Sequence, residues 1–296
     1  MSTAEDRPQA SPLPGIGLML LGILLFVLND LIGKWLVTTY GVGQVLLIRS
    51  IAALIVLAPL IQRAGWRHVA MPAQPGYHLL RVLFATLEVS CFYWAVAYLP
   101  LADVVTFYLA GPIWVTALAG PLLGEIIGWR RWTAVLVGFV GVVVAMRPTS
   151  AALGLPALVA LGGSFFFALL MIITRKVRGC DDITLVTWTT VGAMGMGAVT
   201  APWSWVTPGP GDLVLLALLG VVALGGHMCV NRSLKLAPAA VVVPYQYTQI
   251  VWAVLFGWLV FGDVPETGLY VGSAIIVGAG LYIFMREQTL ARRPGA

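Results

Sequence analysis

Residues 99–125 read LPLADVVTFYLAGPIWVTALAGPLLGE, and residues 237–263 read APAAVVVPYQYTQIVWAVLFGWLVFGD. The two stretches align without gaps, and matches recur in one register: Pro100 on Pro238, Ala102 on Ala240, Val104–Val105 on Val242–Val243, Trp114 on Trp252, and Gly124–Glu125 on Gly262–Asp263. Each match alone is weak, but their common register across two long apolar stretches argues against chance. The chain therefore contains an internal repeat, which sets its architecture.

The composition places this repeat in a membrane. Hydrophobic residues make up 60 % of the chain, charged residues only 10 %, and the mean hydropathy is +0.95. Soluble proteins contain about 25 % charged residues, and a membrane-spanning helix needs about 20 mostly apolar residues. The sequence therefore predicts an all-α polytopic membrane protein with ten transmembrane helices. They are expected at about 15–37, 44–62, 78–98, 102–124, 130–147, 154–175, 183–203, 212–234, 239–261 and 266–285.

The repeat divides these spans into two halves of five, at residues 15–147 and 154–285. Because five is an odd number, the second half enters the bilayer from the opposite side. The sequence therefore predicts two inverted five-helix repeats. Such repeats are typical of secondary transporters, in which the substrate site lies near the midplane between the halves.

The basic residues indicate the orientation of the spans. With the N-terminus in the cytoplasm, 14 of the 17 Lys and Arg residues fall on the cytoplasmic side: Arg7, Arg63, Arg67, Arg81, Arg130, Arg131, Arg175, Lys176, Arg178, Arg232, Lys235, Arg286, Arg292 and Arg293. Cytoplasmic loops carry an excess of Lys and Arg. We therefore expect cytoplasmic tails at residues 1–14 and 286–296 and a multi-pass protein of the cell inner (plasma) membrane. Since topology accounts for the basic charge, nucleic acid is not an expected partner.

Over about residues 15–287 the chain resembles the drug/metabolite transporter superfamily, in its EamA-type branch. The resemblance is carried by the two repeats, by GKWL at residues 33–36, by LLIRS at 46–50 and by VGFVGVVVAMRP at 137–148. It implies a ten-helix, basket-like inner-membrane exporter or importer of metabolites. The nearest likeness is to bacterial amino-acid exporters, including those for aromatic amino acids. The S-adenosylmethionine importers of the superfamily share the Lys and Arg arrangement of the first two spans and stay an open alternative.

Glu88 lies close to the middle of the predicted third span. The residues one helical turn away are Phe84, Ala85, Cys91 and Phe92, so no opposite charge is within helical reach. A charge at the centre of a spanning helix is unfavourable by about 2.5 to 3.5 kcal/mol. Glu88 therefore requires a cavity, a partner on another helix, or a proton. It is a candidate proton carrier or ligand for a substrate ammonium group; the alternative is a neutral glutamate hydrogen-bonded between helices.

Asp30, Lys34 and Arg49 form a second polar group in the outer part of the first two spans. Asp30 and Lys34 are spaced i, i+4, so they share a helix face and can pair. With Arg49 they are predicted to form an outer gate. The alternative has Lys34 extending to the outer headgroups, with Asp30 neutralising Lys34 or Arg49.

The remaining candidate residues lie in the second half and in the fourth span. His227 follows two glycines in the eighth span and is a candidate relay or ligand, although packing alone is an alternative. Pro112 and Pro244 predict helix breaks in the fourth and ninth spans, although they are six residues out of register in the repeat. Polar and aromatic residues near these breaks are predicted to line the site: Tyr108, Trp114, Tyr245, Gln246 and Gln249.

These features together predict a secondary transporter of small organic solutes, with amino-acid export first and uptake of a metabolite such as S-adenosylmethionine second. The chain has no nucleotide-binding loop, so transport is expected to use the gradient of the solute or of an ion, with protons as the candidate. A channel or an intramembrane enzyme is the competing class. Neither a cofactor nor a metal is expected, and Cys91, Cys180 and Cys229 have no disulfide or metal spacing. The expected partners are the small-molecule substrate and the lipid bilayer. The sequence leaves open the solute, the direction of flux, proton coupling and the oligomeric state.

Overall fold

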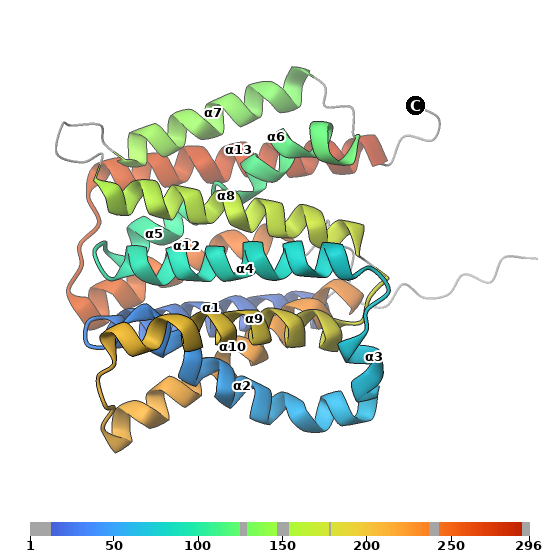
Figure 1. Cartoon of the computed structure of the whole chain (residues 1–296). Helices are drawn as coiled ribbons and strands as arrows, with labels where there is room; N and C mark the ends of the chain where they lie inside the picture. The colour runs from blue at the N-terminus through green and yellow to red at the C-terminus, as the bar shows by residue number, and fades with distance from the viewer. Residues whose placement is uncertain (1–12, 125–128, 147–153, 178, 237–242, 292–296) are drawn as a thin grey trace, which may run out of the picture.

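The computed structural model describes residues 13–124, 129–146, 154–177, 179–236 and 243–291, and the regular structure in these ranges is helical (Figure 1). The first half supplies α1 (Leu13–Val37), α2 (Val42–Ala64), α4 (Pro75–Val96), α5 (Leu101–Tyr108) with α6 (Gly111–Leu123), and α7 (Trp129–Met146). The second half supplies α8 (Leu155–Lys176), α9 (Asp182–Thr200), α10 (Pro210–Leu236), the series η2 (Val243–Tyr247), α12 (Thr248–Phe256) and η3 (Gly257–Phe261), and α13 (Thr267–Ala291). The predicted all-α fold of ten spans is confirmed.

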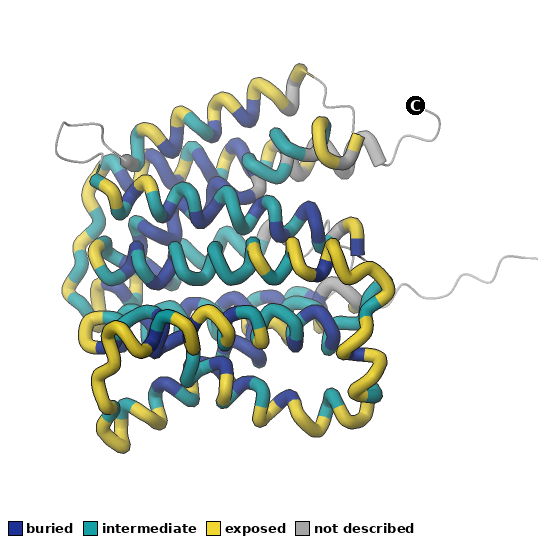
Figure 2. Tube along the Cα trace, viewed as in Figure 1, coloured by how far each residue is buried: buried dark blue, intermediate teal, exposed yellow. Residues whose placement is uncertain are grey.

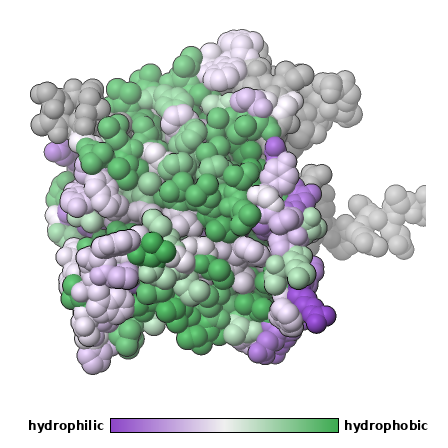
Figure 3. All heavy atoms as spheres, in the orientation of Figure 1, coloured by the Kyte–Doolittle hydropathy of each residue, from purple (hydrophilic) through white to green (hydrophobic). Residues whose placement is uncertain are grey.

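The lengths and surfaces of the helices suit a bilayer. Six described segments are long and apolar enough to cross one: Leu13–Val37, Val42–Ala64, Pro75–Val96, Leu155–Thr174, Asp182–Ser204 and Pro210–Ser233. Large apolar side chains such as Ile55, Leu136 and Val251 are exposed on the outside of the bundle, while the buried positions face inward (Figure 2). Apolar atoms cover the middle of the visible face, and hydrophilic atoms gather towards its two ends (Figure 3). Because lipid is the solvent there, exposed apolar side chains are the expected surface.

Helix pairing follows the inverted repeat. The most extensive packing joins α1 to α10, α4 to α8, α2 to α9 and α7 to α13. An operation that exchanges the halves maps α1 onto α8 and α10 onto α4, so it converts the first of these pairs into the second. The same operation maps the α2–α9 and α7–α13 pairs onto themselves. The packing therefore has the symmetry that the sequence repeat predicts.

Glycines set the closest helix crossings. A Cβ on Gly22 of α1 would lie 3.1 Å from the carbonyl oxygen of Gly226 in α10, and a Cβ on Gly272 of α13 would lie 2.7 Å from that of Gly141 in α7. Between helices in lipid, association depends on such close backbone approach, because no hydrophobic effect separates one apolar face from another. Glycine at these positions therefore permits two of the four main pairs.

The fourth and ninth spans differ from the others because each is interrupted. A turn at Leu109 and Ala110 separates α5 from α6, and Pro112 is the second residue of α6. In the second half, Pro244 lies in the 3-10 helix η2, and η3 is a π-helical turn. Interrupted helices free backbone groups near the middle of a membrane protein, and they are common around transporter sites.

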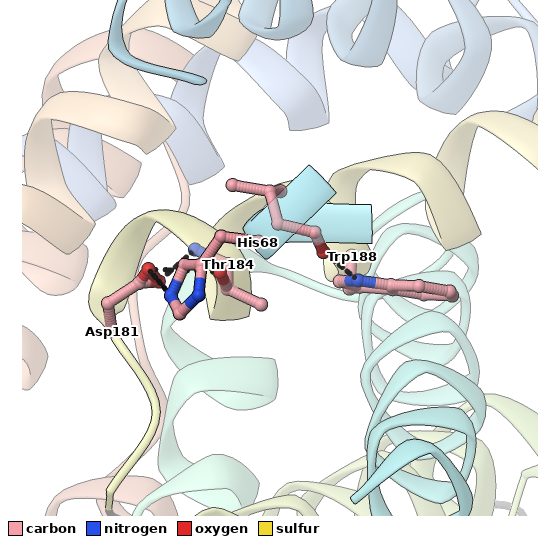
Figure 4. A network of polar contacts seen from close by, with 5 residues as sticks. His68, Asp181, Thr184 and Trp188 are labelled. Atoms are coloured by element: carbon pink, nitrogen blue, oxygen red, sulfur yellow. Dashed lines mark hydrogen bonds and ion pairs between the residues drawn. The ribbon is translucent and has the colours of Figure 1, made fainter. Parts of the chain in front are cut away.

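One end of the bundle carries the short helix α3 (Trp66–Ala70), and we call it the α3 end. There α3 docks on the start of α9 (Figure 4). The Trp188 indole donates to the carbonyl of Val69 at 2.8 Å, and Nε2 of His68 lies 3.4 Å from the Asp181 carboxylate. Asp181 also caps α9 by accepting from the backbone N–H of Thr184 at 2.9 Å. The α3 end is thus connected across the two halves.

The opposite end carries the α1–α2 connection, and we call it the Tyr40 end. The Tyr40 hydroxyl donates to the Asp212 carboxylate at 2.6 Å, and this bond raises the pKa of Tyr40. Gln44 donates to the carbonyl of Val206 at 2.6 Å and accepts from the N–H of that residue at 3.0 Å. These bonds join the first half to the α9–α10 connection of the second.

Candidate functional site

Three charged side chains converge inside the bundle from three different helices. Asp30 lies in the last third of α1, Arg49 in the first half of α2, and Glu88 just past the middle of α4. At 1.5 Å per residue, each lies about 10 to 12 Å inside the Tyr40 end of its helix. Both carboxyl groups interact electrostatically with Arg49 and with each other. We call Asp30, Arg49 and Glu88 the charge cluster; with all three ionised, its net charge is −1.

A hydrogen-bonded chain holds Arg49 in place. Its guanidinium donates to the Tyr93 hydroxyl at 2.6 Å and lies over the Tyr93 ring, with 5.3 Å between Cζ and the centroid. The Tyr93 hydroxyl in turn donates to Oδ1 of Asn29 at 3.1 Å, and the Asn29 amide donates to the carbonyl of Leu219 at 2.7 Å. Tyr93 and Asn29 are buried. The chain thereby connects α2, α4, α1 and α10.

Replacing Tyr93 with phenylalanine tests this chain. The change leaves a donor of Arg49 and an acceptor of Asn29 without their partner, and we expect a loss of about 1 to 3 kcal/mol in the free energy of unfolding. Tyr98→Phe is the matched control, because Tyr98 follows the same helix and is 65 % exposed. Thermal unfolding in detergent measures both variants. Equal unfolding temperatures for the two would show that the Tyr93 hydroxyl contributes nothing.

Glu88 differs from the other members of the cluster because its carboxylate has no hydrogen bond or ion pair to any described residue. The side chain is half-buried and keeps accessible surface. The Tyr108 hydroxyl donates to the backbone carbonyl of Glu88 at 2.9 Å, and the Tyr108 ring packs edge-on against Phe92. An acid that is enclosed but unpaired is available to a proton or to a donor group of a solute.

The second half reaches the cluster through Gln249. Its amide nitrogen lies 3.5 Å from Oδ2 of Asp30, a long hydrogen-bond distance. Gln249 belongs to α12, which directly follows the 3-10 helix η2. This contact spans the boundary between the inverted repeats. The cluster therefore lies where relative movement of the halves would change its surroundings.

The three predicted outer-gate residues do not stay together. Lys34 does not pair with Asp30: its ammonium nitrogen lies 2.5 Å from Oδ2 of Asp263 and 4.4 Å from the centroid of the Phe261 ring. Asp30 and Arg49 lie deeper, in the charge cluster. The predicted Asp30–Lys34 pair is wrong, because the long lysine stem reaches a carboxylate of the second half at the Tyr40 end. The i, i+4 spacing permits an Asp30–Lys34 pair, but it does not exclude a competing carboxylate such as that of Asp263.

His227 lies closer to the α3 end than the charge cluster does. Its side chain is exposed and contacts the Phe26 ring edge-to-face, with 4.8 Å between centroids. Tyr245 packs with Phe26 against the small apolar core of Met19 and Ile23. Gln246 is half-buried beside Tyr245. His227 thus lies beside α1 from α10, and Tyr245 from η2.

Trp114 is placed by packing. Its indole donates to the Ser164 hydroxyl at 3.1 Å, and the ring contacts Phe139 and Phe165 edge-on. Both Trp114 and Tyr108 pack against the main apolar core of the bundle. Among the predicted lining residues, Gln249 and Tyr108 therefore adjoin the charge cluster, whereas Trp114 is held by aromatic packing.

Sequence reasoning missed Tyr93, Phe26 and Asp263 as partners of the predicted residues. Tyr93 is one of many aromatic residues in the spans, and nothing in its neighbours marks it as polar-bonded. Asp263 aligns with Glu125 in the repeat, but the alignment does not indicate which side chain Asp263 contacts. Their roles depend on contacts between distant helices, which local spacing does not encode.

Comparison with known proteins agrees with this architecture. The sequence model of the EamA-like transporter family matches residues 13–147 and 154–285. A riboflavin transporter of Vibrio cholerae is 30 % identical over 95 % of this chain and 96 % of its own length. An S-adenosylmethionine uptake transporter of Rickettsia conorii is 26 % identical over 95 % and 96 %, and a pseudopaline exporter of Pseudomonas aeruginosa 26 % over 90 % and 94 %. A solved crystal structure covers 93 % of this chain and 98 % of its own at 16 % identity, with a TM-score of 0.60, and supports the fold alone.

Proposed function

This chain belongs to the EamA-like transporter family, and from that premise we propose that it carries a planar nitrogen-heteroaromatic metabolite, with riboflavin first, across the membrane by alternating access. The family and the names of its relatives indicate a membrane transporter rather than an enzyme. The observation that carries the proposal is the charge cluster of Asp30, Arg49 and Glu88 inside an otherwise apolar bundle. Charged groups at that depth in a membrane protein are energetically unfavourable, and they usually line a solute or ion pathway.

The chemistry of the interior suits such a solute. Arg49 supplies hydrogen-bond donors, and Asp30 and Glu88 supply acceptors. The accessible His227 and the neighbouring Phe26 offer aromatic faces on the path between the cluster and the α3 end. Riboflavin and S-adenosylmethionine, named in two relatives, both combine a planar nitrogen-containing ring with a polar arm. A mixed polar and aromatic site would recognise that combination.

The proposal includes orientation and coupling. We place the α3 end and both chain termini in the cytoplasm, and the protein in the cell inner membrane, because the predicted loops on that side hold most of the basic residues. Glu88 is the proposed proton carrier, since its carboxylate is enclosed without a paired cation among the described residues. A proton moving down its gradient would then drive the solute.

Amino-acid export is the second candidate. The unpaired Glu88 carboxylate favours it, because that group could hold the ammonium of an amino acid. The relatives named above carry riboflavin, S-adenosylmethionine and pseudopaline instead. The two candidates differ in the solute and the direction of flux, and they share the site.

Purified protein in proteoliposomes tests both candidates. Labelled riboflavin, labelled S-adenosylmethionine and labelled phenylalanine report flux in each direction, with and without a pH gradient, against protein-free liposomes. We expect gradient-driven accumulation of riboflavin that an excess of unlabelled riboflavin suppresses. Flux of phenylalanine without riboflavin flux would reject the heteroaromatic solute in favour of amino-acid transport. Flux of none of the three would reject the proposed substrate class.

A further inference from the structure

The Tyr40 end of the bundle is closed around α5. Six of the eight residues of α5 are buried: Leu101, Ala102, Val104, Val105, Thr106 and Phe107. The helix packs against α12 and also against α1, α7, α8 and α13. The hydroxyls of Thr106 and Ser273 lie 3.0 Å apart and join α5 to α13 of the second half. By contrast, Glu88, Gln249 and His227, which lie further from this end, keep accessible surface.

At the same end, Lys34 connects α1 to the end of η3. Its ammonium group contacts Asp263 and lies over Phe261, and the two charged side chains are 12 % and 27 % exposed. Gly262 has a φ of 69°, a left-handed conformation that ends the π-helical turn and presents Asp263. Because water is largely excluded, the loss of one partner leaves the other charge poorly solvated. Removing one partner is therefore more unfavourable in free energy than it would be for a surface ion pair.

A third charge lies on α5 itself. Asp103, in the first turn of that helix, interacts electrostatically with both Lys34 and Asp263. Lys34 is therefore in direct contact with one carboxylate, that of Asp263 at the end of η3, and within electrostatic range of a second, that of Asp103 on the helix that fills the Tyr40 end. Without Lys34, the two carboxylates would repel each other and separate these elements.

We propose that Lys34, in contact with Asp263 and close to Asp103, holds the Tyr40 end of the transport path closed and must separate from Asp263 before that end opens. The inference rests on the proposed transport function. It assigns Asp263 and Asp103 as gating residues beside Lys34, in place of Asp30 and Arg49, which the sequence predicts as the other members of the outer gate. The charge cluster, where we propose that the solute binds, lies deeper in the bundle than this gate.

Labelling of the native Cys91 tests the gate without any solute. Cys91 is half-buried and lies one turn from Glu88 on α4, and Cys180 and Cys229 are first replaced by serine. A membrane-impermeant thiosulfonate is applied to right-side-out and to inside-out membrane vesicles. We expect wild-type Cys91 to react mainly from the α3 side, with a low rate from the Tyr40 side. In Lys34→Ala and Asp263→Asn, reaction from the Tyr40 side should rise about tenfold, the effect of shifting a conformational equilibrium by about 1.4 kcal/mol.

Three further variants make the test more specific. The exchange Lys34→Asp with Asp263→Lys should restore protection, because it recreates the pair in reverse. Asp212→Asn is the control, since Asp212 also lies at the Tyr40 end but bonds Tyr40. Asp103→Asn should give a smaller rise than Asp263→Asn, because Asp263 still holds Lys34.

Several outcomes would overturn the proposal. They are reaction of wild-type Cys91 from the Tyr40 side as fast as from the α3 side, an unchanged rate from the Tyr40 side in both single variants, or no recovery in the exchanged pair. An unchanged rate in Asp103→Asn alone would remove Asp103 from the gate. Because the labelling needs no solute, a failure to find transported riboflavin leaves this test intact. Conversely, normal transport with unchanged labelling rejects the gate alone.

Discussion

Replacing Glu88 with glutamine is expected to abolish accumulation driven by a pH gradient while solute exchange at equal pH continues. Glutamine has the shape of a protonated glutamate but cannot release a proton. If Glu88 carries the coupling proton, the variant is fixed in the protonated-like state and loses the driving force but not the path. The measurement is solute uptake into proteoliposomes with and without the gradient, beside exchange of labelled for unlabelled solute at uniform pH.

Two variants make this result specific to Glu88. Glu88→Asp keeps a titratable carboxyl and should retain part of the gradient-driven uptake. Asp212→Asn changes a carboxyl at the Tyr40 end, where it accepts from the Tyr40 hydroxyl, and should resemble the wild type. Gradient-driven accumulation that survives in Glu88→Gln would assign coupling to another group. If Glu88→Gln loses both solute exchange and gradient-driven accumulation, Glu88 has a role in binding the solute.

Replacing Gly220 with alanine is expected to produce the largest loss of stability among glycine-to-alanine substitutions in α10. An added Cβ would overlap the backbone carbonyl oxygen of Arg49, which cannot turn aside as a flexible side chain would. Helices α10 and α2 would have to separate at the charge cluster, and the neighbouring carbonyl of Leu219, which accepts from Asn29, would move with α10. Overpacking of this kind is unfavourable by about 1 to 3 kcal/mol or more.

Gly225→Ala is the matched control in the same helix. Its added Cβ would lie 3.5 Å from Cδ1 of Leu25, an ordinary van der Waals contact. Since alanine favours a helix over glycine by about 1 kcal/mol, this variant should be neutral or more stable. Thermal unfolding of the two variants in one detergent separates these expectations. Similar unfolding temperatures would mean that α2 and α10 can move apart at Arg49 without loss.

The sequence by itself determined the spans and their arrangement. The window expected at about 183–203 is α9 at Asp182–Thr200 with η1 (Ala201–Ser204) following, and the turn before Pro112 divides the fourth span. Such agreement has a local cause: in lipid, each helix must satisfy its own backbone hydrogen bonds, so length and hydropathy of a short stretch suffice to define it. The repeat register added the inverted pairing of helices. The sequence also indicated that Glu88 requires a cavity, a partner on another helix, or a proton.

The tertiary structure alone decided which side chains meet. Helical spacing offered Lys34 only Asp30, whereas the fold offers it Asp263 from the other half of the chain. Likewise, nothing near Tyr93 in the sequence shows that it receives a hydrogen bond from Arg49 and gives one to Asn29. Many faces of these helices are similarly apolar, so the hydropathy pattern does not specify how the helices rotate and slide against one another. Close packing at glycines fixes that registration, and with it the partner of every buried charge.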